Sequence, residues 1–125
     1  MRALVLGAIA LLVSASLAFA ADDPMANAYG NTVISKGSSG ESHTHYKKGG
    51  TLDATLSGMM GSVTLTGTWK IDDKGQLCRT YDNPPPMLPI PNPFCAQWTS
   101  HNVGDTWTVT FNGQTRTVSL VKGIQ

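Results

Sequence analysis

Charged residues are scarce in this sequence and almost balanced in sign. Nine lysines and arginines face eight acidic residues over 125 positions, a net charge of +1. Binding to nucleic acid or to an anionic membrane is driven by a clustered positive field. The only adjacent basic pair is Lys47-Lys48, so no such field is indicated. We therefore expect no nucleic-acid partner.

Motifs of catalytic and cofactor sites are also missing. There is no Gly-x-Ser-x-Gly elbow, no Cys-x-x-Cys pair, and only one glutamate, Glu41, for a carboxylate pair. The segment 72–75, Asp-Asp-Lys-Gly, lacks the ligand spacing of a calcium loop and indicates a turn. We predict a protein that is not an enzyme and has no catalytic residues.

Long apolar runs are limited to the first residues of the chain. Arg2 precedes an apolar stretch over 3–13, and Ala18-Phe19-Ala20 has the small-x-small pattern of a signal-peptidase site. The stretch is shorter than the roughly 20 residues that a bilayer core requires. We predict a signal peptide over 1–20, cleaved after Ala20, a periplasmic or secreted location, and no membrane span thereafter.

Only two cysteines are present, Cys78 and Cys95. In an exported protein they are expected to form a disulfide, and closing a loop of this size is worth roughly 3 kcal/mol. A structural bridge is therefore predicted.

Helical periodicity is absent, and short alternating runs rich in Thr, Val and Trp are separated by Gly, Asn and Asp. The predicted strands are 31–36, 42–48, 51–57, 62–71, 76–81, 96–99, 105–112 and 114–121. Residues 21–28 lack this pattern and are predicted to be a flexible lead-in to a single β domain over 29–125. The short links favour an all-β fold, a small antiparallel up-and-down or half-open barrel of about six to eight strands. A two-sheet sandwich is the alternative.

The alternation also predicts which side chains share a face of the sheet. Val63, Leu65 and Trp69 share one face, as do Trp107, Val109 and Phe111 of a later run. Arg116 shares its face with Val118 and Leu120. One face of each strand is therefore expected to form the core.

Six of the seven prolines lie in the segment 82–94. Proline removes backbone donors and favours extended structure, so this segment is predicted to be a stiff loop held at its base by the disulfide. Its apolar residues Met87, Leu88, Ile90 and Phe94 are candidate binding residues. The loop either docks an unknown protein or small ligand, together with the barrel rim, or folds back as a lid over the barrel.

His43 and His45 are the candidate metal ligands. Residues i and i+2 of a strand lie on one face, so both imidazoles could reach one zinc or copper ion. The residues that could supply a third ligand are His101, Glu41, Asp53, Met59, Met60 and Met87. The alternative is that both histidines are simply polar side chains facing solvent.

Four short motifs carry a family resemblance: Gly30-Asn31-Thr32, Gly67-Thr68-Trp69, the two cysteines, and Gly104-Asp105. Together they resemble a group of small exported bacterial proteins of unknown function. The Gly-Thr-Trp element is also similar to that of lipocalin and avidin-like barrels. The resemblance implies a barrel in which this element packs at the closed end.

Overall fold

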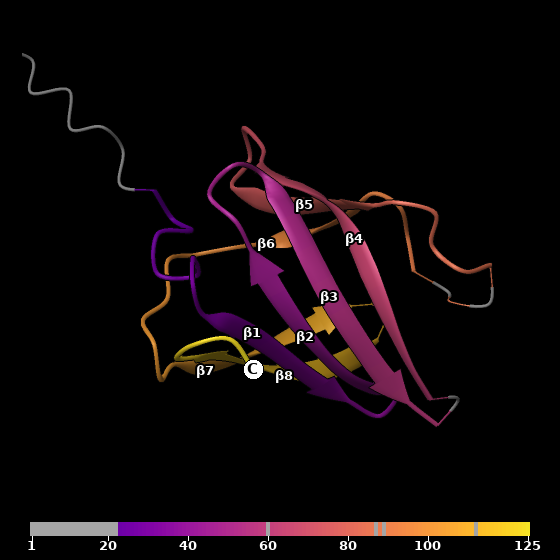
Figure 1. The fold of residues 1–125 in the computed structure, drawn as a ribbon. Coiled ribbons are helices and arrows are strands. Elements are labelled where there is room, and N and C mark those ends of the chain that lie inside the picture. Colours follow the sequence, from indigo (N-terminus) through magenta and orange to yellow (C-terminus); the bar gives the residue numbers. More distant parts are fainter. Residues whose placement is uncertain (1–22, 60, 87, 89, 112) are drawn as a thin grey trace, which may run out of the picture.

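All described secondary structure is antiparallel β-sheet. The computed structural model describes residues 23–59, 61–86, 88, 90–111 and 113–125. Its strands are β1 (Thr32–Gly37), β2 (Gly40–Tyr46), β3 (Thr51–Gly58), β4 (Gly61–Ile71), β5 (Gln76–Tyr81), β6 (Phe94–Gln97), β7 (Thr106–Phe111) and β8 (Gln114–Val121). They form one sheet in the order β6-β5-β4-β3-β2-β1-β8-β7 (Figure 1).

The sheet curls strongly into a half-barrel, as Figure 1 shows. The predicted all-β, half-open barrel is therefore confirmed. The alternative of a two-sheet sandwich is wrong, because backbone hydrogen bonds join all eight strands into one sheet. Among the described residues no helix is long and apolar enough to cross a membrane. The predicted signal peptide, 1–20, lies outside the described residues.

The two edge strands, β6 and β7, face each other across the opening of the half-barrel, and no ladder joins them within the described residues. Their side chains meet instead. Phe94 and Phe111 lie with ring centroids 4.9 Å apart, and Trp98, just after β6, lies 5.8 Å from Trp107 of β7. Aromatic contact rather than backbone pairing therefore bridges the two edges.

The core lies on the concave face, where alternate residues of each strand point inward. Its buried strand residues are Val33, Tyr46, Leu52, Ala54, Leu65, Leu77, Tyr81, Val118 and Leu120. Half-buried Trp69, the aromatic residue of the Gly-Thr-Trp motif, packs against this cluster and donates its indole N–H to the Lys47 carbonyl at 2.9 Å. The alternation that predicted the faces thus matches the observed core.

Residues 23–28, part of the segment predicted to be a flexible lead-in, pack onto the half-barrel. Met25 and Ala28 are buried in the core cluster. The Trp98 indole N–H donates to the Pro24 carbonyl at 2.9 Å, and the Asn27 amide donates to the His101 carbonyl at 2.8 Å. A short run of turns has no periodicity, so the sequence carries no pattern that reveals this packing.

Candidate functional site

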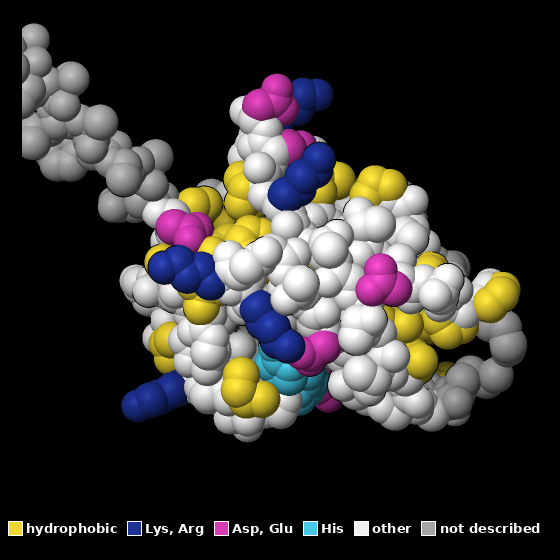
Figure 2. Space-filling model, turned by 45° about the horizontal axis from the view of Figure 1, so that its top comes forward, with side chains coloured by type: hydrophobic (Ala, Val, Ile, Leu, Met, Phe, Trp, Pro, Cys, Tyr) yellow, Lys and Arg dark blue, Asp and Glu magenta, His cyan; other side chains and the backbone are white. Residues whose placement is uncertain are grey.

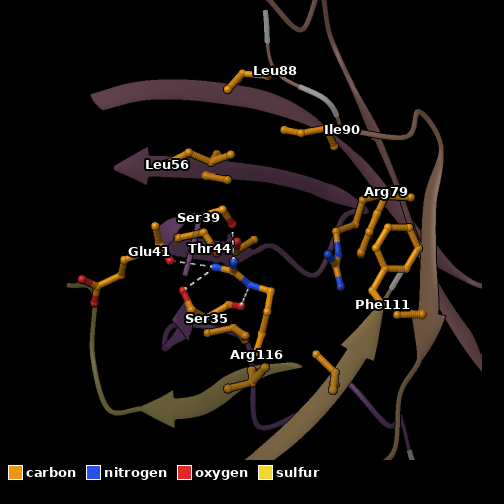
Figure 3. Close-up of a pocket in the computed structure, with 18 of the residues that line it drawn as sticks. Ser35, Ser39, Glu41, Thr44, Leu56, Arg79, Leu88, Ile90, Phe111 and Arg116 are labelled. Carbon is orange, nitrogen blue, oxygen red and sulfur yellow. Dashed lines mark hydrogen bonds between the residues drawn. The ribbon is translucent and has the colours of Figure 1, made fainter. Parts of the chain in front are cut away.

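The concave side of the half-barrel holds a partly open cavity of about 1110 Å³. Every strand of the sheet contributes side chains to its lining, and the loop 82–94 adds to it (Figure 3). Most of the lining is apolar, including Leu56, Val63 and Val109. A concave, mainly apolar space with a few polar groups is typical of a ligand site.

The proline-rich loop contributes to the wall of this cavity. Leu88, Ile90 and Phe94, three of the four candidate binding residues, line it, and all three are half-buried. Leu88 and Ile90 also pack against the core cluster. Met87, the fourth candidate, lies outside the described residues. The structure thus brings the described apolar residues of the loop to the inside of the half-barrel.

Two kinds of link hold the end of this loop to β5. The predicted disulfide between Cys78 and Cys95 is confirmed and joins β5 to β6. The Asn92 side-chain amide accepts from the Tyr81 N–H at 2.9 Å and donates to the Tyr81 carbonyl at 3.0 Å. The cavity wall that carries Ile90 and Phe94 is therefore anchored close to both residues.

Two arginines extend into the cavity, as Figure 3 shows. Arg116 of β8 donates from Nε to the Ser35 hydroxyl at 2.6 Å and from Nη1 to the Ser39 hydroxyl at 3.0 Å. Its Nη2 donates to the carbonyls of Ser35 and Gly40 at 3.0 and 3.1 Å. Arg116 thus links β8 to the β1–β2 hairpin through four hydrogen bonds.

Arg79 of β5 has a different environment. Its guanidinium carbon lies 4.9 Å from the centroid of the Phe94 ring, a cation–π geometry. Its Nε is buried without a hydrogen-bond partner. No ion pair among the described residues involves Arg79, so its positive charge faces the cavity without a protein carboxylate.

Tyr46 and Tyr81 lie near the Arg79 guanidinium and line the same cavity. Burial raises the pKa of Tyr46 to about 12, against the smaller opposing effect of Arg79. Its phenol is therefore neutral at physiological pH and keeps its hydroxyl proton. Next to Arg79 the cavity holds a second potential hydrogen-bond donor.

His43 and His45 do share one face of β2, the convex outer face. His43 Nε2 lies 3.1 Å from Glu41 Oε1, and His45 Nδ1 lies 2.6 Å from Asp53 Oδ1. Figure 2 shows histidine side chains at the surface with an acidic and a basic side chain beside them. Each imidazole is thus engaged by its own carboxylate.

The other proposed metal ligands are dispersed. His101 stacks on Trp107 with ring centroids 3.4 Å apart, and Met59 is fully exposed. Met60 and Met87 lie outside the described residues. No group of three or more histidine, cysteine or acidic side chains able to hold a metal ion was found among the described residues. A zinc or copper site at His43 and His45 stays a prediction.

Sequence patterns did not identify Arg79 and Tyr46 as residues of a cavity. The sequence does contain a signal for Arg79. Leu77, Arg79 and Tyr81 are every second residue of β5, so the three side chains must share one face. No sequence pattern indicates that Arg79 lacks a counter-ion, because this depends on where the seven other strands place their acidic residues.

Comparison with protein-family models, curated proteins and solved structures gave no match to this chain. The resemblance to small exported bacterial proteins and to lipocalin-like barrels therefore stays a prediction. The candidate site is defined by its own geometry: an apolar cavity with a cationic side chain exposed to it.

Proposed function

We propose that this protein binds a small molecule with a large apolar body inside the half-barrel, without transforming it chemically. The observation that carries the proposal is the cavity of about 1110 Å³ on the concave face of the sheet. Known small-molecule sites have volumes of roughly 300–1,000 Å³ and mainly apolar linings. The space is thus large enough for a lipid-sized or aromatic ligand.

The composition of the lining supports binding rather than catalysis. Besides the two tyrosine phenols, its hydroxyl groups come from serines and threonines such as Ser35 and Ser39, which accept hydrogen bonds from Arg116. In the described part of the lining, no serine or threonine hydroxyl is hydrogen-bonded to a histidine or carboxylate. A nucleophile paired with a base is the usual mark of covalent catalysis.

The proposed site of action is outside the cytoplasm, in a periplasm or in the medium. Two observations support it: the Cys78–Cys95 disulfide, which persists in oxidising compartments, and the signal-like leader over 1–20. A ligand carrier in such a compartment protects an apolar molecule from water.

Fluorescence titration with N-phenyl-1-naphthylamine, a neutral apolar probe, tests the proposed function. The exported protein is expected to raise the probe's emission saturably, with one probe bound per chain. Val63→Trp, on the cavity wall, should abolish the effect. Its matched control is Thr64→Trp, one residue away on the exposed outer face, which should leave binding unchanged.

Near-ultraviolet circular dichroism of both variants verifies that each is folded. Lack of saturable binding by the wild-type protein would contradict the proposal. Equal binding by folded Val63→Trp and Thr64→Trp would also contradict it, because the probe would then occupy another surface.

A copper or zinc site at His43 and His45 is the second function that we propose. It is supported by two imidazoles on one strand face with Glu41 and Asp53 beside them, which makes a set of nitrogen and oxygen donors. Calorimetric titration with Zn²⁺ and Cu²⁺ should then give a dissociation constant below about 10 µM. The double variant His43→Ala, His45→Ala should lose this binding, and Thr55→Ala should keep it. Binding that survives the double change would reject the site.

A further inference from the structure

We infer that the ligand of the half-barrel is an anionic amphiphile, with a carboxylate-like head group paired with Arg79 and an apolar body along the cavity wall. This inference rests on the proposed function, because it names the chemical class of molecule that the same cavity binds. It is carried by the distribution of basic residues, the missing counter-ion of Arg79 and the apolar lining around it.

The lysines lie on the outside of the half-barrel and the arginines on its inside. All six lysines of the described chain are exposed: Lys36, Lys47, Lys48, Lys70, Lys74 and Lys122. The two arginines of the described chain, Arg79 and Arg116, are only partly exposed and line the cavity. Arginine, with its planar fork of donors, is the residue suited to bidentate recognition of a carboxylate or phosphate.

The cavity contains too little negative charge to balance these two arginines. Glu41 is the only acidic residue in its described lining. The Glu41 carboxylate lies 3.1 Å from His43 Nε2 and 3.7 Å from Lys36 Nζ, so it is engaged on the outer side of β2. The interior of the half-barrel is therefore electropositive.

The two arginines differ in the donors that remain free for a ligand. Arg116 has five N–H groups, of which four donate to protein oxygens. It is therefore a positioning residue, although its neutral acceptors leave its charge uncompensated. The polar neighbours of Arg79 are the hydroxyl groups of Tyr46 and Tyr81, which carry no negative charge, and its buried Nε has no hydrogen-bond partner.

A buried charge without a partner is costly, and the cost falls when an opposite charge with hydrogen-bonding capacity binds beside it. A carboxylate next to Arg79 would accept from the guanidinium and from the neutral phenol of Tyr46. The Phe94 ring on one side of Arg79 holds the guanidinium in place by the cation–π contact. These three side chains make a preformed head-group site.

The remainder of the lining suits a hydrocarbon chain. Leu56 of β3 and Ile90 and Leu88 of the proline-rich loop face the same space as the two arginines in Figure 3. Burying a methylene group there is worth about 0.8 kcal/mol. An anionic head near Arg79 and an apolar tail toward the loop wall would satisfy both parts of the cavity.

Competition with bound N-phenyl-1-naphthylamine tests the inference with three ligands that share a ten-carbon chain: decanoate, decanol and the decyltrimethylammonium cation. At about pH 7.5 decanoate is ionised. A charge-assisted hydrogen bond is worth about 1.5–3 kcal/mol, so decanoate should displace the probe at roughly 10- to 100-fold lower concentration than decanol. The cation should be the weakest competitor.

Arg79→Gln should remove the preference for decanoate over decanol, because competition by decanoate weakens far more than competition by decanol. The matched control is Lys70→Gln. Lys70 is exposed and lies on β4, the strand that pairs with the strand of Arg79, so this variant should behave as the wild type. Near-ultraviolet circular dichroism and retained probe binding verify that Arg79→Gln is folded. Should that variant fail to fold, the order of the three ligands on the wild-type protein still decides.

Equal displacement by decanoate and decanol from the wild-type protein would overturn the anionic-ligand inference and leave the proposed function standing. A decanoate preference that persists in folded Arg79→Gln would overturn the role of Arg79. Failure of the neutral probe itself to bind would instead count against the proposed function, and the inference would fall with it.

Discussion

His101 is a titratable residue that lies among the aromatic side chains at the edge of the half-barrel. Its ring stacks on Trp107 and meets Trp98 edge-on with centroids 5.2 Å apart. Burial lowers the pKa of His101, and the carboxylate of Asp105, 3.9 Å from its Nδ1, opposes that effect only in part. The neutral imidazole is therefore the form that this packing favours.

The stability of the protein should fall as pH falls through the ordinary histidine pKa of about 6.5. The unfolded chain then binds a proton at His101 before the folded chain does, so protonation favours unfolding. The stabilisation is fully present above this pH and is lost toward the lowered pKa of the folded state. Urea unfolding near pH 7.5 and near pH 5.5 measures the effect.

His101→Phe keeps an aromatic ring against Trp107 but cannot titrate, so it should lose less stability than the wild type between the two pH values. The two proteins differ only at position 101, so any difference in their pH dependence comes from that residue. An equal loss in the two proteins would contradict the assignment of this pH dependence to His101.

Single residues were only partly predictable from the sequence. The alternation of strand residues placed Arg116 with Val118 and Leu120, and all three do line or flank the concave interior. The absence of an ion pair at Arg79 among the described residues was not predictable, because it depends on the positions of acidic side chains from distant strands. Sequence patterns indicate a face but not the partners found on it.

Gly67 sets how closely β4 and β5 approach. A Cβ atom built at this position would collide with the backbone carbonyl oxygen of Thr80, a group that cannot rotate away. Gly67→Ala should therefore destabilise the protein by roughly 1–3 kcal/mol, the range for overpacking. Gly49→Ala is the control, because nothing lies within 4 Å of its Cβ position and its φ is not in the left-handed region.

Urea unfolding of the two glycine variants makes the comparison. If Gly67→Ala is as stable as Gly49→Ala, the close approach of β4 to β5 does not constrain the sheet. The Gly-Thr-Trp motif would then need another explanation for its glycine.

The disulfide should contribute mainly by restricting the unfolded chain. Replacing both Cys78 and Cys95 with serine is expected to lower the free energy of unfolding by about 3 kcal/mol. The sheet should nevertheless form, because Asn92 still links the loop to Tyr81 and the other ladders are unaffected. Loss of less than about 1 kcal/mol would contradict a structural role for the bridge.

All eight strands were predictable, since period-two alternation and turn residues mark them locally. Six of the strands have boundaries that differ from the predicted ones by one or two residues, and two of these differences have a clear physical reason. β2 begins at Gly40 rather than Ser42, because Gly40 adopts φ 133° and lets the hairpin turn tightly. β6 begins at Phe94 rather than Ala96, since pairing of Phe94 with Arg79 extends the ladder up to the last proline of the loop.

At the scale of the whole molecule, the curl of the sheet and the contact between its edges create the cavity. The contact of Phe94 with Phe111 and of Trp98 with Trp107 joins strands that are not neighbours in the sheet. Such long-range contacts leave no local pattern, so the sequence could predict a barrel or half-barrel but not how its edges meet. It also could not decide between a docking loop and a loop that lines the interior.

The most direct test of the central claim, that the interior of the half-barrel is a ligand site, is an NMR measurement of nuclear Overhauser effects between decanoate and the protein. We expect contacts from the decanoate chain to the side chains of Leu56, Val63 and Ile90, which line the cavity. Contacts only to exposed apolar residues outside the cavity, such as Val103 and Ile124, or none at all, would contradict the claim.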